Sequence, residues 1–199
     1  MISFLSHIDD TLFLLINSHH TGFFDFFFYL VTWLGNGWVV TPILLVIAYV
    51  KIPKKRLALF ILVSAVGMIA SGLINSKVKD VTHRPRPLAY FSSSPADTMA
   101  DQGPAYKIHV VGEPLSSRAF PSGHSNTAFS AATLVALAFG GWYWLAVIPA
   151  LLVGYSRIYI GAHFPFDVFA GGLLGILVMI VTVILIRIFV LSPRPLEPL

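Results

Sequence analysis

The sequence contains no cysteine among its 199 residues. Disulfide bonds, thiol chemistry and cysteine-ligated metal sites are therefore excluded, although the redox compartment does not follow from that absence. Charged residues are also scarce, at 11% of the chain, whereas an average soluble domain has about 25%. Hydrophobic residues make up 56% of the chain. These proportions predict one all-α integral membrane domain that covers residues 1–199.

Features of several other protein classes are missing as well. The N-terminus shows no basic n-region followed by a small-residue cleavage site, so we expect no cleaved signal peptide. The net charge is only +4, and basic residues do not alternate with aromatic ones, so we expect no nucleic-acid partner. Much of the positive charge lies in residues 51–56, where it suits an anionic membrane surface. Nothing in the sequence indicates an oligomeric state.

Long apolar runs predict a bundle of five transmembrane helices. We expect them near residues 37–53, 56–78, 122–140, 142–158 and 165–190. The uncharged run 125–156 is too long for one crossing, and Gly140-Gly141 divides it into a hairpin next to an aromatic belt at 142–144.

Two shorter apolar segments lie in the N-terminal region 1–36. Residues 7–18 and 23–35 would each be roughly 20 Å long as helices, too short for a hydrocarbon core of about 30 Å. We expect both to be interfacial helices. In the alternative, residues 23–35 cross the membrane with help from their flanks, which would give six transmembrane helices.

The positive-inside rule orients the predicted bundle. We expect the protein in the inner (cytoplasmic) membrane. Four of the six residues 51–56 are basic, so this loop is expected to face the cytoplasm. The loop 80–121 is then extracytoplasmic, and Arg187 at the end of the last run returns to the cytoplasm. Three polar clusters, at 79–87, 121–124 and 156–167, all fall on the outer face.

The residues of these clusters suit an anion. Pro165 is expected at the first position of a helix, which puts Asp167 in the first turn and within hydrogen-bond reach of His163. Pro-Ser-Gly-His at 121–124 opens another helix, whose free N–H groups attract anions. Lys79, Arg86 and Arg157 add cations that match phosphate oxygens. The combination predicts phosphoryl transfer, with His163 as nucleophile and His124 as acid. No carboxylates stand at metal-ligand spacing, so we expect neither a metal nor a cofactor.

The three clusters together resemble a known signature. Lys79-x6-Arg86-Pro87, Pro121-Ser122-Gly123-His124 and Ser156-Arg157-x5-His163-x3-Asp167 are similar to the tripartite motif of the type-2 phosphatidic acid phosphatase superfamily. That superfamily includes bacterial lipid phosphatases, glucose-6-phosphatase and vanadium haloperoxidases. A second register, from Lys77 to Arg84-Pro85, has the same spacing. We prefer the first register because members commonly show Arg-Pro-Arg-Pro with the second Arg in the motif.

The resemblance implies a metal-independent hydrolase with a phosphohistidine intermediate. His163 would attack phosphorus, Asp167 would orient it, and His124 would protonate the leaving oxygen. The remaining motif residues would bind phosphate: Lys79, Arg86, Ser122, Gly123 and Arg157. The substrate would be a lipid phosphate in the membrane, for which candidates are undecaprenyl pyrophosphate, phosphatidylglycerophosphate and lipid A 1-phosphate.

Two other functions fit the same residues. A transporter or flippase for anionic lipids would use the cationic site for binding only, and a vanadate-dependent haloperoxidase would share the pocket. The remaining histidines lie outside the motif. We expect solvated side chains for His7, His19 and His20 at the interface and for His83 and His109 in the loop.

Overall fold

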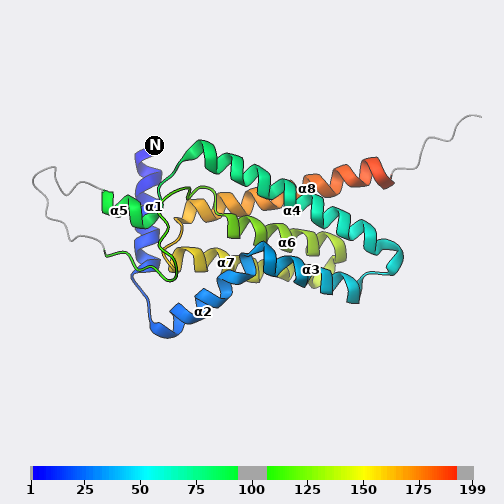
Figure 1. Ribbon diagram of the computed structural model, residues 1–199, viewed down its shortest axis with the longest axis horizontal. Helices are drawn as coiled ribbons and strands as arrows, with labels where there is room; N and C mark the ends of the chain where they lie inside the picture. Colours follow the sequence, from blue (N-terminus) through cyan, green and yellow to red (C-terminus); the bar gives the residue numbers. More distant parts are fainter. Residues whose placement is uncertain (1, 94–106, 192–199) are drawn as a thin grey trace, which may run out of the picture.

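The computed structural model describes residues 2–93 and 107–191, and in these ranges all regular structure is helical (Figure 1). The all-α class predicted from the sequence is therefore confirmed. The elements are α1 (Ile2–Asn17), α2 (Gly22–Thr32), η1 (Trp33–Gly35), α3 (Gly37–Lys51), α4 (Lys54–Thr82), α5 (Pro87–Ser93), α6 (Gly123–Phe139), η2 (Gly141–Ala146), α7 (Val147–Tyr159) and α8 (Pro165–Leu191).

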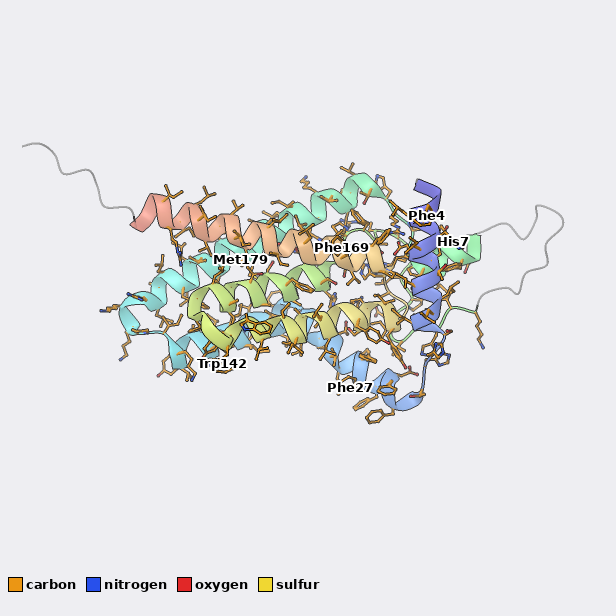
Figure 2. All side chains as sticks on the ribbon, turned by 180° about the vertical axis from the view of Figure 1, so that it is seen from behind. Phe4, His7, Phe27, Trp142, Phe169 and Met179 are labelled. Atoms are coloured by element: carbon orange, nitrogen blue, oxygen red, sulfur yellow. The ribbon has the colours of Figure 1, made fainter. Side chains whose placement is uncertain are left out.

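Most helices run along the long axis of the molecule, while α1 crosses one end of the bundle (Figure 1). Helix α6 lies at the centre and contacts α3, α4, α7 and α8. Its apolar face joins a core that includes Leu134 and Met179, both almost fully buried. The turn between α3 and α4 and the hairpin of Trp142 lie at the end opposite α1 (Figures 1 and 2). We call the end that α1 crosses the α1 end. We call the opposite end the basic end, because Lys51, Arg56 and Arg187 line a cavity there.

Local signals explain where the central helices begin and end. The hydroxyl of Ser122 accepts a hydrogen bond from the Ser125 N–H and caps α6 at its N-terminus. Gly140 ends α6 with a φ of +63° and Gly141 follows with +53°, a conformation that glycine adopts without steric cost. The hairpin predicted at this pair is therefore present. Trp142 and Trp144 beside it are 69% and 61% exposed, as an interfacial belt requires.

Two glycines let α8 pack directly on the start of α6. A Cβ atom at Gly171 would lie 2.3 Å from the carbonyl oxygen of Ser122, and one at Gly175 would lie 2.3 Å from that of Asn126. Glycines four residues apart share one helix face, so the backbones approach along this face as in other membrane helix pairs. The close approach also brings Ser122 N–H within 2.8 Å of the Asp167 carbonyl oxygen.

The number of membrane crossings stays a prediction. Two stretches of the described residues are long and apolar enough to span, Lys54–Ser92 and Pro165–Ile188, and a third results if the bent pair Gly22–Gly35 and Gly37–Lys51 counts as one span. Helices α6 and α7 have 17 and 13 residues, so they would need their flanking turns to cross a core of about 30 Å. Five or six crossings are not established by helix length.

Residues 23–35 belong to the bundle, but whether they cross the membrane stays a prediction. Helix α2 packs along α7 and buries Phe28 and Thr32, so it is part of the bundle. It joins α3 at a bend of 66°. Gly35 sits at this bend, and its lack of a side chain admits the His124 Cβ, which would be 2.8 Å from a Cβ there. Helix α1, in contrast, crosses the bundle end as an interfacial helix would (Figure 1).

The predicted loop 80–121 contains more helix than expected. Helix α4 continues to Thr82, and α5 occupies Pro87–Ser93. Residues 94–106 of this loop lie outside the described residues. The segment from 107 onward returns to the α1 end, where Val111 N–H donates to the Ile160 carbonyl at 3.2 Å.

Replacing Gly171 by alanine should destabilise the fold, because the new methyl group would push α8 away from Ser122. We expect a loss of about 1–3 kcal/mol, typical of overpacking in a tight core. Gly72→Ala is the matched control: Gly72 also lies within a helix, but no atom lies within 4 Å of a Cβ there, so this variant should be neutral or slightly stabilising. Thermal unfolding in mild detergent measures both, and equal stability of the two variants would contradict the packing argument.

Candidate active site

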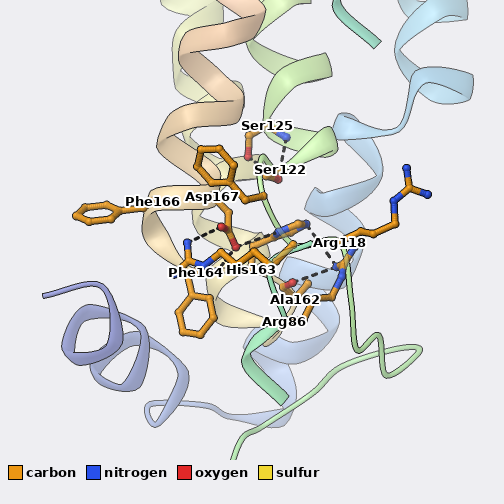
Figure 3. Close-up of polar contacts among 12 residues, drawn as sticks. Arg86, Arg118, Ser122, Ser125, Ala162, His163, Phe164, Phe166 and Asp167 are labelled. Carbon is orange, nitrogen blue, oxygen red and sulfur yellow. Dashed lines mark hydrogen bonds and ion pairs between the residues drawn. The ribbon is translucent and has the colours of Figure 1, made fainter. Parts of the chain in front are cut away.

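The three polar clusters converge at the α1 end of the bundle (Figure 3). The first covers the last turn of α4 and the connection to α5, the second opens α6, and the third joins α7 to α8. Segments that are far apart in sequence therefore surround His163, whose side chain is 2% exposed.

His163 lies in the short connection between α7 and α8. Its backbone N–H donates to the Arg157 carbonyl at 3.1 Å, which holds the turn against the end of α7. Its Nδ1 lies 3.5 Å from Oδ2 of Asp167, a contact that a small movement of the ring would turn into a hydrogen bond. Burial, and then the positive charges of Arg157, Arg86 and Lys79, hold the pKa of His163 well below its ordinary value. The imidazole is therefore neutral at pH 7, the form that can act as a nucleophile.

Asp167 is fully buried in the first turn of α8, as the Pro165 start predicted. Its Oδ2 accepts a hydrogen bond of 3.0 Å from the Phe164 N–H. Its Oδ1 accepts one of 2.7 Å from Arg84 Nη1. The carboxylate is thus fixed on both oxygens, and its position beside His163 does not depend on the histidine.

Arg86 lies on the other side of the His163 ring (Figure 3). Its Nη1 donates to the Ala162 carbonyl at 3.0 Å and lies 3.4 Å from His163 Nε2. Its Nε donates to the Ser117 carbonyl at 3.0 Å. The oxygen atoms of a phosphoryl group attached to Nε2 would therefore lie next to the guanidinium of Arg86.

Arg157 and Lys79 are the other two cations of the site. Arg157 is 7% exposed, and its Nη1 donates to the Thr32 hydroxyl at 2.7 Å. Among the described residues its Nε finds no acceptor. Lys79 Nζ donates to the Arg118 carbonyl at 2.8 Å. Arg157 and Lys79 thus keep donor capacity that a phosphate could use. Lys77, the lysine of the alternative register, is exposed.

Ser122, Gly123 and His124 form the start of α6. The Ser122 hydroxyl is occupied within the helix, because it accepts from the N–H and the O–H of Ser125, the latter at 3.0 Å. Gly123 faces Asn75, whose Oδ1 would lie 3.8 Å from a Cβ at that position. Asn75 is 4% exposed, and its Nδ2 has no partner among the described residues. This amide therefore keeps free donor capacity beside the start of α6.

Two further charged residues, Arg84 and Asp9, lie next to the site; the motif analysis named Arg84 only in the second register and did not include Asp9. Arg84 places Nη2 at 2.6 Å from Asp9 Oδ2 while its Nη1 binds Asp167, so one guanidinium joins two fully buried carboxylates. Its plane also lies over the Phe164 ring, 4.5 Å from the centroid. Asp9 Oδ1 accepts in turn from the Phe166 N–H at 2.8 Å. For Asp9 the available signal was the pair of acidic residues, Asp9 and Asp10, between the apolar residues of α1.

A small cavity of about 130 Å³ lies beside the site. Its lining includes Thr32 and Arg157, the acidic Glu113, and the apolar Leu88 and Leu115.

Comparison with known proteins places these residues in context. The sequence pattern described as the PAP2 superfamily matches residues 58–190. The lipid A 4'-phosphatase of Porphyromonas gingivalis is 32% identical over 182 residues, which cover 89% of this chain and 72% of the relative. The undecaprenyl-diphosphatase of Sulfolobus acidocaldarius is 47% identical, but over 57 residues that make up only 28% of each chain.

The fold is similar to that of a solved structure as well. The crystal structure of Aquifex aeolicus LpxE superposes with a TM-score of 0.65 and 31% identity, and the match covers 87% of this chain and 93% of that one.

Replacing Arg84 by alanine should destabilise the protein strongly, because two buried carboxylates would lose their shared cation. Breaking a buried pair costs about 3–5 kcal/mol. Arg118→Ala is the matched control, because its ion pair with Asp80 is about half exposed on both sides; we expect at most about 1 kcal/mol there. Unfolding followed by circular dichroism compares them, and an Arg84→Ala variant as stable as Arg118→Ala would refute the role of the pair.

Proposed function

The chain belongs to the PAP2 superfamily, and from this premise we propose that it hydrolyses a phosphomonoester or a diphosphate on a membrane lipid through a phosphohistidine intermediate. The resemblance seen in the motifs is thereby confirmed at the level of the family. One observation carries the proposal: neutral, buried His163 has Asp167 near one ring nitrogen and Arg86 near the other.

The first step forms a bond between His163 Nε2 and phosphorus and breaks the bond from phosphorus to the leaving oxygen. Arg86 contacts the attacking nitrogen already, so its guanidinium can bind equatorial oxygens as negative charge develops on them. Asp167 stabilises the imidazole while it gains positive charge, and Arg84 keeps that carboxylate in place.

His124 supplies the proton that the leaving oxygen takes up. The negative charge of a bound phosphate favours the protonated form of this histidine. In the second step water attacks the phosphohistidine, His124 accepts the proton from that water, and inorganic phosphate leaves with His163 restored. The same residue thus serves as acid and then as base.

The surroundings support a lipid as substrate. The bundle carries large exposed apolar side chains such as Phe169, which is 70% exposed (Figure 2). A substrate in the membrane could therefore keep its acyl or prenyl chain among apolar groups while its phosphate reaches the cations. Candidates are undecaprenyl pyrophosphate, phosphatidylglycerophosphate and phosphates of lipid A. Phosphate release from a panel of these lipids by one purified sample tests the proposal.

The two histidines should respond differently to the leaving group. His163→Ala should abolish turnover of every substrate, because no covalent intermediate can form. His124→Ala should lose about 10²–10⁴-fold on a lipid phosphate, the usual contribution of a general acid, yet regain much of that rate on an aryl phosphate whose phenol is acidic. Asp167→Asn should fall between them.

Steady-state rates on the two kinds of substrate measure this pattern. His7→Ala serves as control, because His7 is exposed on the outer part of α1 (Figure 2) and should keep both rates. Rescue of His163→Ala but not of His124→Ala by the aryl phosphate would show that the roles are reversed.

Catalysis should not require a divalent metal ion, because the cations of the site are protein side chains. We expect the rate to persist in excess EDTA at a temperature well below unfolding. Vanadate should inhibit, since it mimics pentacoordinate phosphorus between His163 and Arg86. Activity that disappears in EDTA and returns with Mg²⁺ would overturn the mechanism.

The α1 end should face the outside of the cytoplasmic membrane, because the basic end holds the residues that the positive-inside rule places inside. The absence of cysteine allows a direct test with single-cysteine variants. Cysteine in place of exposed Lys107 should react with an impermeant reagent added outside, and cysteine in place of exposed Lys54 should not. The opposite labelling pattern would invert the topology.

A further inference from the structure

Two histidines that we expected to be solvated meet next to a carboxylate at the α1 end. The rings of His20 and His109 stack with centroids 3.7 Å apart and planes within 2° of parallel. His109 Nε2 lies 3.0 Å from Asp25 Oδ1. His20 is exposed as expected, but His109 is half-buried and hydrogen-bonded, so the expectation for it was wrong.

We propose that His20, Asp25 and His109 bind a divalent transition metal ion, with Zn²⁺ as the best match to their donor atoms. One ligand atom from each of the three residues lies within 4.8 Å of the others. Two ligands of a tetrahedral zinc, each about 2 Å from the metal, are about 3.3 Å apart. The ligand atoms are close to this spacing, and the His20 ring must rotate out of its stack with His109 to point a nitrogen at the same metal. Imidazole nitrogen and carboxylate oxygen are both zinc ligands, and water would complete the coordination.

The surrounding hydrogen bonds hold two of the ligands in advance. Asn17 is 2% exposed, accepts from the His109 N–H at 2.9 Å and donates to the His109 carbonyl at 2.8 Å. The Tyr159 hydroxyl donates to Asp25 Oδ1 at 3.0 Å. Such outer contacts orient metal ligands in proteins and lower the entropy lost on binding. Only His20, in the connection between α1 and α2, must adjust.

A metal here would connect three separate segments. His20 follows α1, Asp25 belongs to α2, and His109 lies in the described segment that begins at residue 107. The His109 carbonyl packs against Gly161, where a Cβ would lie 2.3 Å from that oxygen. Gly161 precedes His163 by two residues, so the metal would clamp the segment from 107 to 111 onto the turn that holds the nucleophile.

Zinc content measures the proposal without relying on activity. Purified protein without a histidine tag is equilibrated in detergent with Zn²⁺ at a series of free concentrations. We expect one zinc per chain for the wild type and at least tenfold weaker binding for His20→Ala and Asp25→Asn. His19→Ala is the matched control, because His19 is the exposed neighbour whose Nδ1 contacts the Leu15 carbonyl instead, and it should bind zinc as the wild type does.

Amide exchange gives a second readout that follows the position of the metal. Zinc should slow exchange of the His109 and Val111 amides in the wild type and in His19→Ala, but not in His20→Ala. Equal zinc affinity of the wild type and His20→Ala, or loss of binding in His19→Ala, would overturn the proposal. The lipid phosphatase proposal is unaffected by either outcome, because none of the three ligands contacts the reacting groups.

Discussion

The shared ion pair of Arg84 with two buried carboxylates organises the α1 end of this protein. Asp167 cannot remain charged in an apolar bundle without a partner, and Arg84 provides one through a bond of 2.7 Å. The same guanidinium binds Asp9, which also accepts the Phe166 N–H. One cation therefore fixes α1, the chain after α4 and the first turn of α8 relative to each other. The orientation of the proposed catalytic carboxylate depends on this link between distant segments.

Around His163 positive charge is in excess, whereas the carboxylates at Arg84 outnumber the cation there. Arg86, Arg157 and Lys79 all raise the positive potential at the ring, whereas the carboxylates nearby are already paired with Arg84. Mutual repulsion among these cations is a cost that folding must bear, and a phosphate with two negative charges relieves it. Burial first, and then the charge of these cations, keep His163 unprotonated, so the cations that favour binding of an anion also help to prepare the nucleophile.

Local spacing accounts for what the sequence could predict. Pro165 starts α8 and Ser122 caps α6, so the positions of Asp167 and His124 relative to those helix ends follow from a few neighbouring residues. Arg84 with Asp9, or Arg157 with Thr32, could not be predicted, because these pairs join segments 75 and 125 residues apart. A break between the helices at 23–35 and 37–53 was expected, but the close packing of Val153 and His124 against Gly35 could not be predicted, for the same reason.

The interior of the bundle bears on the choice between an enzyme and a transporter. A cavity of about 990 Å³ with Lys51, Arg56 and Arg187 exists at the basic end, so anionic groups could bind near both ends. Between the ends, Met179 is fully buried and lies against Gly67, where a Cβ would be 2.7 Å from its sulfur. Moving a phosphate headgroup past this contact would strip its water inside close-packed apolar side chains, at a cost of several kcal/mol. Hydrolysis at the α1 end requires no such passage, and the arrangement of His163, Asp167 and Arg86 is needed for hydrolysis but not for binding alone.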